Sequence, residues 1–214
     1  MSLKGFIFDL DGVIVFTDQF HYKAWKVMAD ELGVYFDEEI NNRLRGVSRM
    51  ESLDIILEHY DGEPLSEEMK VSLAEKKNTF YRDLLVSMSP EDVTNEVRET
   101  LNKLREKGYT LAIGSSSKNA KFILDKVALT DVFDAISDGT NITNSKPDPE
   151  VFLKAAEYIH LKPEECAVIE DAVAGVDAAK AANMLAIAVG DAIGYERNDY
   201  DIDSFSQILA LNCL

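Results

Sequence analysis

Five short runs of apolar residues lie along the chain, and polar residues do not alternate within them. Apolar runs of this length are typical of parallel strands buried on both faces of a sheet. The predicted strands cover residues 5–10, 110–116, 135–138, 166–171 and 185–190. Helical patterns at 93–107, 118–129, 149–159 and 173–183 separate the later strands. The alternation predicts right-handed strand–helix–strand units and an α/β fold with a doubly wound, Rossmann-like parallel sheet.

Residues 16–87 break this alternation, since helical patterns fill the whole segment. The first of its helices carries an apolar stripe and ends at Gly33. The next begins at Ser48, and Glu51 three residues later completes a capping-box pattern. A later helix covers residues 67–85. The segment therefore has the pattern of an all-helical block.

A helical block inserted after the first strand indicates a second domain. We expect a core domain of residues 1–15 and 88–214 and a helical cap domain of residues 16–87. A chain of 214 residues is long enough for both. Because ligands of open α/β sheets bind at the carboxyl ends of the strands, we expect the cap to cover that edge.

Composition and charge narrow the range of partners. The formal net charge of −17 disfavours nucleic acid and anionic membranes, which bind to basic patches. It also requires any phosphate site to gather its cations locally. Cys166 and Cys213 lie far apart without metal-ligand spacing, so we expect a reduced, cytoplasmic chain without disulfides. The sequence shows neither a membrane-spanning apolar run nor the pattern of a signal peptide.

Polar groups stand where the predicted strands end. Asp9 and Asp11 follow the first strand in "FIFDLDGVI", Ser115 follows the second, and Glu170 with Asp171 ends the fourth. Parallel strands present such groups at one edge of the sheet. Two carboxylates on one face repel each other, so a cation or a reaction must compensate for the repulsion.

Carboxylates gathered at one edge offer hard oxygen ligands to Mg²⁺, which binds through a few of them together with substrate phosphate. A carboxylate can also attack phosphorus and form an aspartyl phosphate. Lys146, in "SKPDP", would offset phosphate charge, while hydroxyl and backbone N–H groups would hold its oxygens. The Asp9–Asp11 pair alone is equally consistent with a simple turn after a strand. The groups at several strand ends together favour phosphoryl transfer.

In these motifs the chain resembles the haloacid dehalogenase-like (HAD) phosphotransferase superfamily. "DLDGV" matches its first motif, Ser115 its second, Lys146 its third and "IEDAVAGV" its fourth. The resemblance implies that Asp9 is the nucleophile and that Asp11 is the general acid and base. It also implies a Mg²⁺ shell made of Asp9, Asp11, Glu170 and Asp171.

The predicted cap is similar to that of the β-phosphoglucomutase branch of this superfamily. The likeness lies in Thr17, His21 and Trp25, in "LRGVSRMES", in "KKN" and in "SSSKN". It implies that the non-reacting phosphate is held by Arg49, Ser117, Lys118 and Asn119. It implies further phosphate or sugar ligands at Thr17, His21, Trp25, Gly46, Val47, Ser52, Lys77, Ser115, Ser116 and Lys146. Lys76 is the alternative to Lys77.

Several of these residues also have a purely structural interpretation. Arg49 follows the helix cap Ser48, where the helix dipole favours anions, but a solvated residue at a helix start would look the same. His21 could lie close to Asp11 or be a satisfied boundary histidine. Trp25 could line the pocket or belong to the core of the cap.

The resemblance implies a Mg²⁺-dependent phosphomutase that interconverts β-D-glucose 1-phosphate and glucose 6-phosphate through β-glucose 1,6-bisphosphate. A mutase must hold two phosphates, whereas a hydrolase needs to hold one. The first alternative is a sugar-phosphate phosphatase of the same superfamily. The second is a non-catalytic binding protein, which would be expected to lack a motif acid. We expect a monomer whose partner is a small sugar phosphate.

Four residues at three places in the chain depart from the pattern of the relatives. Phe16 replaces an acidic residue at the first hinge, and Arg45 replaces a lysine before "GVSR". Asn95 and Glu96 stand where the second hinge commonly has Pro-Gly. These changes affect the expected opening of the hinges more than the expected chemistry.

Overall fold

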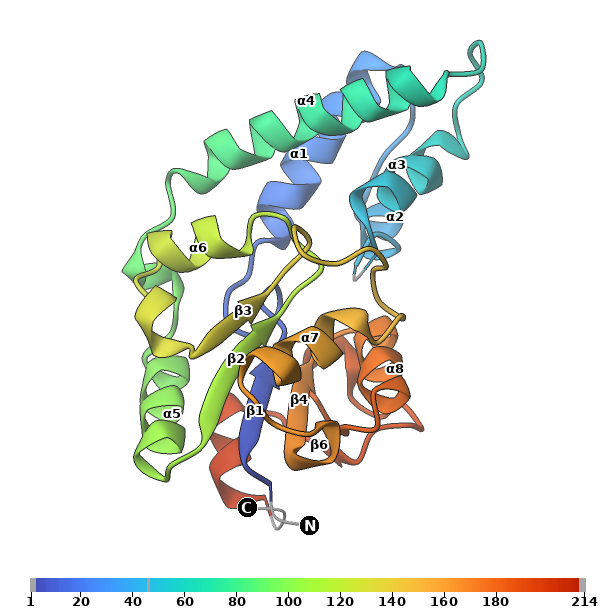
Figure 1. Ribbon diagram of the computed structural model, residues 1–214. Helices are drawn as coiled ribbons and strands as arrows, with labels where there is room; N and C mark the ends of the chain where they lie inside the picture. The colour runs from blue at the N-terminus through green and yellow to red at the C-terminus, as the bar shows by residue number, and fades with distance from the viewer. Residues whose placement is uncertain (1–2, 46, 212–214) are drawn as a thin grey trace. The chain divides into compact units, whose positions relative to one another are not determined.

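The structure, a computed structural model, describes residues 3–45 and 47–211 (Figure 1). The chain forms two compact units. One consists of residues 1–16 and 89–214, and the other consists of residues 17–88. The chain therefore passes between the units twice, after Phe16 and after Met88.

The larger unit is built on a parallel sheet with the strand order β3-β2-β1-β4-β5-β6. The strands of the described chain are β1 (Gly5–Phe8), β2 (Thr110–Gly114), β3 (Ala135–Ser137), β4 (Cys166–Glu170), β5 (Leu185–Ala188) and β6 (Tyr200–Asp201). In the centre, Phe8 of β1 pairs with Ile113 of β2 and with Ile169 of β4. This register brings the carboxyl ends of the three central strands to one edge and confirms the predicted α/β fold.

Helices follow the strands as predicted. They are α5 (Asn95–Glu106), α6 (Ala120–Lys126), α7 (Glu150–Tyr158) and α8 (Val173–Ala181). Single 3₁₀ turns cover Pro90–Asp92, Thr130–Val132, Pro163–Glu165 and Gly190–Ala192. The last helical segment of the described chain is a 3₁₀ helix, Phe205–Ala210. The side chain of Ser204 does not cap this segment, and 3₁₀ geometry is common in such short pieces.

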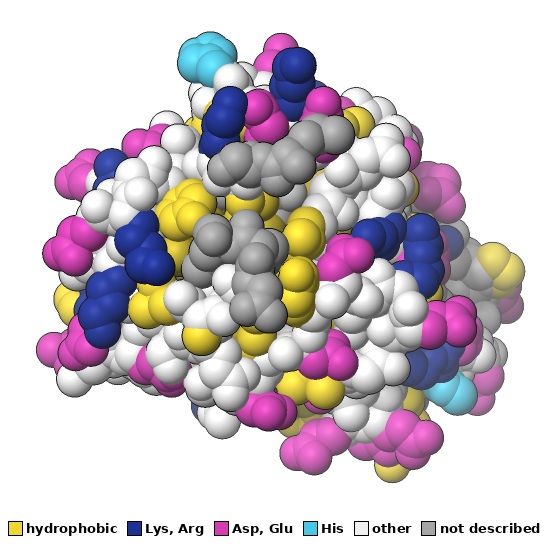
Figure 2. All heavy atoms as spheres, turned by 90° about the horizontal axis from the view of Figure 1, so that it is seen from below, with side chains coloured by type: hydrophobic (Ala, Val, Ile, Leu, Met, Phe, Trp, Pro, Cys, Tyr) yellow, Lys and Arg dark blue, Asp and Glu magenta, His cyan; other side chains and the backbone are white. Residues whose placement is uncertain are grey.

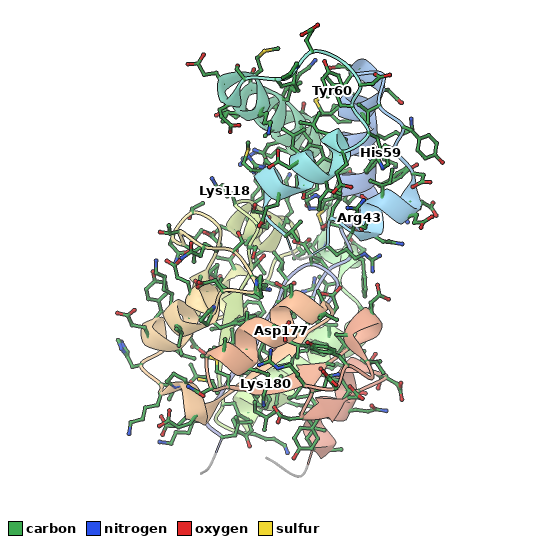
Figure 3. All side chains as sticks on the ribbon, turned by 90° about the vertical axis from the view of Figure 1, so that its right-hand side faces the viewer. Arg43, His59, Tyr60, Lys118, Asp177 and Lys180 are labelled. Atoms are coloured by element: carbon green, nitrogen blue, oxygen red, sulfur yellow. The ribbon has the colours of Figure 1, made fainter. Side chains whose placement is uncertain are left out.

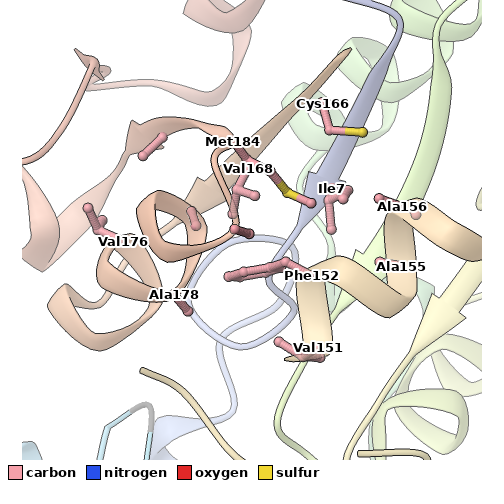
Figure 4. Packing of buried hydrophobic residues seen from close by; sticks show 14 of the residues in the cluster. Ile7, Val151, Phe152, Ala155, Ala156, Cys166, Val168, Val176, Ala178 and Met184 are labelled. Carbon is pink, nitrogen blue, oxygen red and sulfur yellow. The ribbon is translucent and has the colours of Figure 1, made fainter. Parts of the chain in front are cut away.

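The two faces of the sheet bury different residues, because side chains alternate along a strand. On one face, Ile7 and Val168 pack with Phe152 of α7 and Val176 of α8 (Figure 4). On the other face, the ring of Phe8 stacks at 5.7 Å from the ring of Phe205. Both faces are therefore covered, which explains why the central strands show no polar alternation.

The smaller unit contains α1 (Asp18–Glu31), α2 (Glu38–Asn42), α3 (Arg49–Leu57) and α4 (Glu67–Leu85). Trp25 and Met28 of α1, Leu53 and Ile56 of α3 and Ala74 of α4 share its core. The Ser48–Glu51 capping box is present. The segment is not helical throughout, since residues 33–37 and 59–66 connect helices. The interpretation of this unit as a cap remains a prediction.

Within the described ranges, no helix combines the length and the apolar character that a membrane span requires.

Candidate active site

The central strands place three buried ionic side chains together at the carboxyl edge of the sheet. The backbone N–H of Asp9 donates to the carbonyl oxygen of Ile169 at 3.0 Å, which extends the β1–β4 pairing by one residue. The Lys146 ammonium donates to Oδ1 of Asp9 and to Oε1 of Glu170. These three side chains come from segments far apart in the sequence, as the motif order predicted.

Asp171 adds a third carboxylate to this group. One carboxylate oxygen from each of Asp9, Glu170 and Asp171 lies within 4.8 Å of the others. Burial, followed by the charges of Glu170 and Asp9, raises the pKa of Asp171 to about 8. Burial alone would lower the pKa of Lys146, but the charges of Asp9 and Glu170 raise it above its usual value. One lysine thus faces three carboxylates, and the raised pKa of Asp171 reflects the cost of burying their negative charges together.

The donor set of this cluster fits a magnesium ion. Asp9, Glu170 and Asp171 offer only carboxylate oxygens, the hard ligands that Mg²⁺ prefers, and no softer nitrogen or sulfur ligand belongs to the cluster. Asp11 lies in the turn that follows β1, where the N–H groups of Ile14 and Val15 both donate to the carbonyl of Leu10. This turn keeps Asp11 at the same edge of the sheet as Asp9.

Two glycines allow the carboxylates to come this close. Gly12 has φ +87°, and a Cβ there would lie 2.0 Å from Oδ2 of Asp171. Gly175, in the first turn of α8, would place a Cβ 1.9 Å from Oε1 of Glu170. Any side chain at either position must displace a carboxylate.

The change Gly175→Ala is expected to push Glu170 away from Lys146 and to lower the rate of phosphoryl transfer about 10- to 100-fold, because misplaced catalytic groups are costly. Overpacking is expected to reduce the free energy of unfolding by about 1–3 kcal/mol. Steady-state kinetics and urea unfolding measure the two effects. The reverse change in the same turn, Ala174→Gly, is the control, since it costs about 1 kcal/mol without touching Glu170. Equal rates for the two variants would contradict the expectation.

The loop after β2 carries the predicted phosphate ligands Ser115 to Asn119. Oγ of Ser115 accepts the N–H of Ser117 at 3.1 Å, and Oγ of Ser117 accepts the N–H of Asn119 at 3.2 Å. Oγ of Ser116 is buried, and no hydrogen bond to it is formed within the described chain. Lys118 is exposed and labelled in Figure 3. The loop is therefore ordered by its own hydroxyl groups next to the end of β1.

In the helical unit, His21 and Lys77 form a second group of predicted site residues. The Lys77 ammonium lies 2.9 Å from Nδ1 of His21 and 4.6 Å from the ring centroids of Trp25 and Tyr81. Lys77 is 2% exposed, whereas Lys76 pairs at 2.5 Å with Glu31 on the surface. Of the two candidate lysines, Lys77 is thus the one beside His21. Trp25 belongs to the core of the unit and also faces this ammonium.

Acid is expected to destabilise the protein through His21. Burial first, and then the charges of Lys77 and Arg49, hold the pKa of His21 well below 6.5. Below pH 6.5 the unfolded state binds a proton at this histidine that the native state does not, so the contribution of His21 to the free energy of unfolding falls by up to about 1.4 kcal/mol per pH unit. Urea unfolding between pH 7.5 and 5.5 measures this slope. It should be shallower in His21→Gln, and identical slopes would contradict the prediction.

Arg49 begins α3 and is held by a neutral partner. Its Nη2 donates to Oδ1 of Asn78 at 2.8 Å. Burial lowers the pKa of Arg49, and the charge of Glu75 partly offsets this effect. Ser52 is buried one turn further along the helix.

Other predicted ligands are placed as follows. Thr17 is fully buried immediately before α1, and Val47 is partly buried before the cap of α3. Gly46 lies outside the described residues.

Of the positions that depart from the pattern of the relatives, Phe16 is 70% exposed and Arg45 lies 3.4 Å from Asp18. At the second connection, Thr94 accepts the N–H of Val97 and begins α5 without Pro-Gly.

Sequence reasoning missed several residues that contact the predicted ones. Tyr81 stacks on His21 with ring centroids 4.1 Å apart, Asn78 holds Arg49, and the Phe152 ring lies 4.8 Å from the Lys146 ammonium. Tyr81 lies one helical turn after Lys77, so helical spacing from that lysine could have indicated it.

Comparison with known proteins agrees with this geometry. The family model of haloacid dehalogenase-like hydrolases matches residues 3–183. A β-phosphoglucomutase of Bacillus subtilis is 41% identical over 189 residues, which cover 88% of this chain and 84% of the relative. A phosphorylated carbohydrates phosphatase of Thermotoga maritima is 30% identical over 184 residues, covering 85% and 82%.

A solved structure gives the same result. The crystal structure of a β-phosphoglucomutase from Clostridium difficile superposes with a TM-score of 0.90 at 39% identity, covering 96% of this chain and 93% of that one. Sequence motifs, sheet topology and the acidic cluster at the sheet edge all agree with these matches. The chain therefore belongs to the haloacid dehalogenase-like hydrolase family.

Proposed function

We propose that the protein is a phosphomutase that interconverts β-D-glucose 1-phosphate and glucose 6-phosphate. The observation that carries this proposal is the presence of two separate cationic groups. One is Lys146 beside Asp9, and the other is Arg49, whose guanidinium is hydrogen-bonded to the neutral side chain of Asn78. A mutase must bind a phosphate that reacts and one that does not. The 41% identity to a β-phosphoglucomutase supports the same substrate.

In this proposal Asp9 is the nucleophile. Its carboxylate attacks the phosphorus of the bisphosphate, the bond from phosphorus to the sugar oxygen breaks, and an aspartyl phosphate forms. Asp11 donates a proton to the departing sugar oxygen. In the reverse direction Asp11 removes the proton from the attacking sugar hydroxyl, and the phosphoryl group leaves Asp9. The bisphosphate must turn over between the two transfers, and β-glucose 1,6-bisphosphate is therefore both intermediate and activator.

Lys146 and the loop after β2 stabilise the charge of the transferring phosphoryl group. Lys146 is already in contact with Asp9, and Ser115 and Ser116 directly follow the neighbouring strand β2. Asp9, Glu170 and Asp171, with the backbone of Asp11, would hold Mg²⁺. When bound, this ion supplies positive charge to the phosphoryl oxygens during the transfer.

The remaining predicted ligands are assigned to the other parts of the substrate. Arg49, Ser117, Lys118 and Asn119 hold the phosphate that does not react. Residues of the helical unit contact the sugar: Thr17, His21, Trp25, Gly46, Val47, Ser52 and Lys77. Their closure over the aspartyl phosphate would exclude water, which separates a mutase from a hydrolase. A monomer in the cytoplasm remains our prediction.

A sugar-phosphate phosphatase is the second candidate. The 30% identity to a phosphorylated carbohydrates phosphatase and the exposed Phe16 at the first connection favour it. This candidate differs in one respect, since water rather than a sugar hydroxyl takes the phosphoryl group from Asp9.

One assay distinguishes the two candidates. The protein is mixed with β-glucose 1-phosphate, Mg²⁺ and a trace of β-glucose 1,6-bisphosphate. Glucose 6-phosphate is followed by coupled NADPH formation, and free phosphate is measured in parallel. Rapid formation of glucose 6-phosphate with little phosphate is expected, and omission of the bisphosphate should cause a lag. Dominant phosphate release would overturn the mutase proposal in favour of the phosphatase, and neither product would overturn both.

A further inference from the structure

The first turns of α7 hold the loop that leads to Lys146. Oε2 of Glu150 accepts the backbone N–H of Thr143 at 2.9 Å and that of Asn144 at 2.8 Å. Oε1 of Glu150 pairs with the Lys154 ammonium at 2.7 Å, one helical turn further along. Lys154 and the two N–H groups lower the pKa of Glu150 to about 2, so its carboxylate stays charged. One carboxylate therefore joins the loop to the helix.

Lys154 and Tyr158 of α7 form two more hydrogen bonds with the same loop. The Lys154 ammonium also donates to the backbone carbonyl of Asn141. Nδ2 of Asn141 lies 3.0 Å from the hydroxyl of Tyr158, and its Oδ1 accepts the N–H of Asp138 at 2.6 Å. The loop between β3 and Lys146 is thus attached to one face of α7 at successive points.

These contacts with α7 determine the course of the loop, because the loop has no regular secondary structure from residue 138 to residue 149. Its course is set by the side chains that hold its backbone. Asn144 lies two residues before Lys146, whose ammonium must reach Asp9 and Glu170. At its other end the loop meets the second motif, where the N–H of Gly139 donates to the carbonyl of Ser117 at 3.1 Å.

We propose that Glu150, assisted by Lys154, is a positioning residue that places Lys146 for phosphoryl transfer. The inference rests on the proposed function, since it concerns transfer to Asp9. The plain alternative is a surface ion pair at i,i+4 spacing, which contributes a few tenths of a kcal/mol to a helix. Glu150 differs from such a pair because its carboxylate accepts two backbone N–H groups of the loop.

Three variants distinguish a positioning role of Glu150 from that of a simple surface ion pair. Glu150→Ala removes both the ion pair and the acceptor. Glu150→Gln keeps an acceptor oxygen without the charge. The double change Glu150→Lys/Lys154→Glu restores opposite charges in the helix but leaves the two N–H groups of Thr143 and Asn144 without an acceptor. The assay is phosphate release from a simple aryl phosphate, which reports transfer to Asp9 for a mutase and for a phosphatase.

A shift in the course of the loop moves Lys146, and a misplacement of about 1 Å can cost up to about 100-fold in rate. We expect Glu150→Ala to lower kcat about 10- to 100-fold with KM within about twofold. The double change should be as slow as Glu150→Ala, and Glu150→Gln should lose less. Amide hydrogen exchange gives a second readout. Thr143 and Asn144 should lose protection in Glu150→Ala and in the double change.

The matched control is Glu99→Gln, which breaks the exposed i,i+4 pair with Lys103 in α5 and should leave kcat unchanged. Wild-type kcat in Glu150→Ala, or full recovery in the double change, would overturn the proposal. If Glu150→Ala unfolds at the assay temperature, the double change decides, because it also removes the acceptor of the two N–H groups and wild-type kcat there would overturn the proposal. A wild-type protein that releases no phosphate and forms no glucose 6-phosphate would instead refute the proposed function, while the exchange data would still test the loop contacts.

Discussion

Replacing Asp9 by asparagine is expected to lower the rate of phosphoryl transfer by at least about 10⁴-fold, or about 5.4 kcal/mol in activation free energy. The amide is isosteric with the carboxylate but is not a nucleophile toward phosphorus. Both the mutase assay and phosphate release from an aryl phosphate should fall together, because both pass through Asp9. Single-turnover kinetics with mass spectrometry of the protein measure the rate and exclude deamidation back to aspartate.

The same variant should keep or gain thermal stability when Mg²⁺ is absent. Asp9, Glu170 and Asp171 repel one another around a single lysine, so removing one charge relieves the repulsion. Glu170 still pairs with Lys146. Calorimetry in metal-free buffer tests this. Asp131→Asn, an exposed aspartate outside the site, is the control for the chemical change. A rate above about 1% of wild type with asparagine intact would contradict the assignment of the nucleophile.

Replacing Arg49 by alanine is expected to affect the two reactions very differently. Formation of glucose 6-phosphate should fall at least about 100-fold in kcat/KM, because a charge-assisted contact to the non-reacting phosphate is lost. Phosphate release from a small aryl phosphate should stay within about threefold, since that substrate has no second phosphate. Parallel steady-state measurements with both substrates provide the comparison.

Two further variants sharpen this test. Arg49→Lys keeps the charge but not the fork of donors, so it should fall between wild type and alanine. Arg43→Ala removes an exposed arginine of the same unit that pairs with Glu58 at 2.7 Å (Figure 3), and it should leave both reactions unchanged. Equal losses of both reactions in Arg49→Ala would refute the assignment of a second phosphate site to this residue.

The sheet was predictable because its strands are buried on both faces. All five predicted strands begin at the residue where the observed strand begins and end within two residues of the observed end, and the positions of Asp9 and Glu170 follow directly from that placement. The strand β6 was not predicted, since it has only two residues, Tyr200 and Asp201. The register then brought Lys146 to the two acids, which the order of motifs had already indicated.

Residues that act on other site residues were harder to predict. The sequence pattern around Glu150 predicts the start of a helix. Nothing in that local pattern indicates that the Glu150 carboxylate accepts two N–H groups from the preceding loop. Asn78 has no sequence signal for a contact with Arg49, which lies 29 residues earlier. Such contacts depend on tertiary packing. Periodicity and motif spacing describe only one segment at a time.

The distribution of charged side chains on the surface bears on how anions are bound. Viewed from below, acidic and basic side chains are interspersed around apolar side chains rather than gathered into a basic face (Figure 2). This agrees with the expectation from the net charge of −17 that anions are bound by a few local cations. Lys146 and Arg49 are the cations that we propose for this role.

The central position of β1 has a consequence for synthesis on the ribosome. This strand is made first, yet both neighbours come much later, at Thr110–Gly114 and Cys166–Glu170. At about 5–20 residues per second, β1 waits on the order of ten seconds for its second partner. The helical unit, residues 17–88, needs only contacts within its own sequence and can fold during that interval. Nascent chains that stop before residue 110 would therefore carry a folded helical unit and an unpaired apolar strand, a state that favours aggregation and chaperone binding.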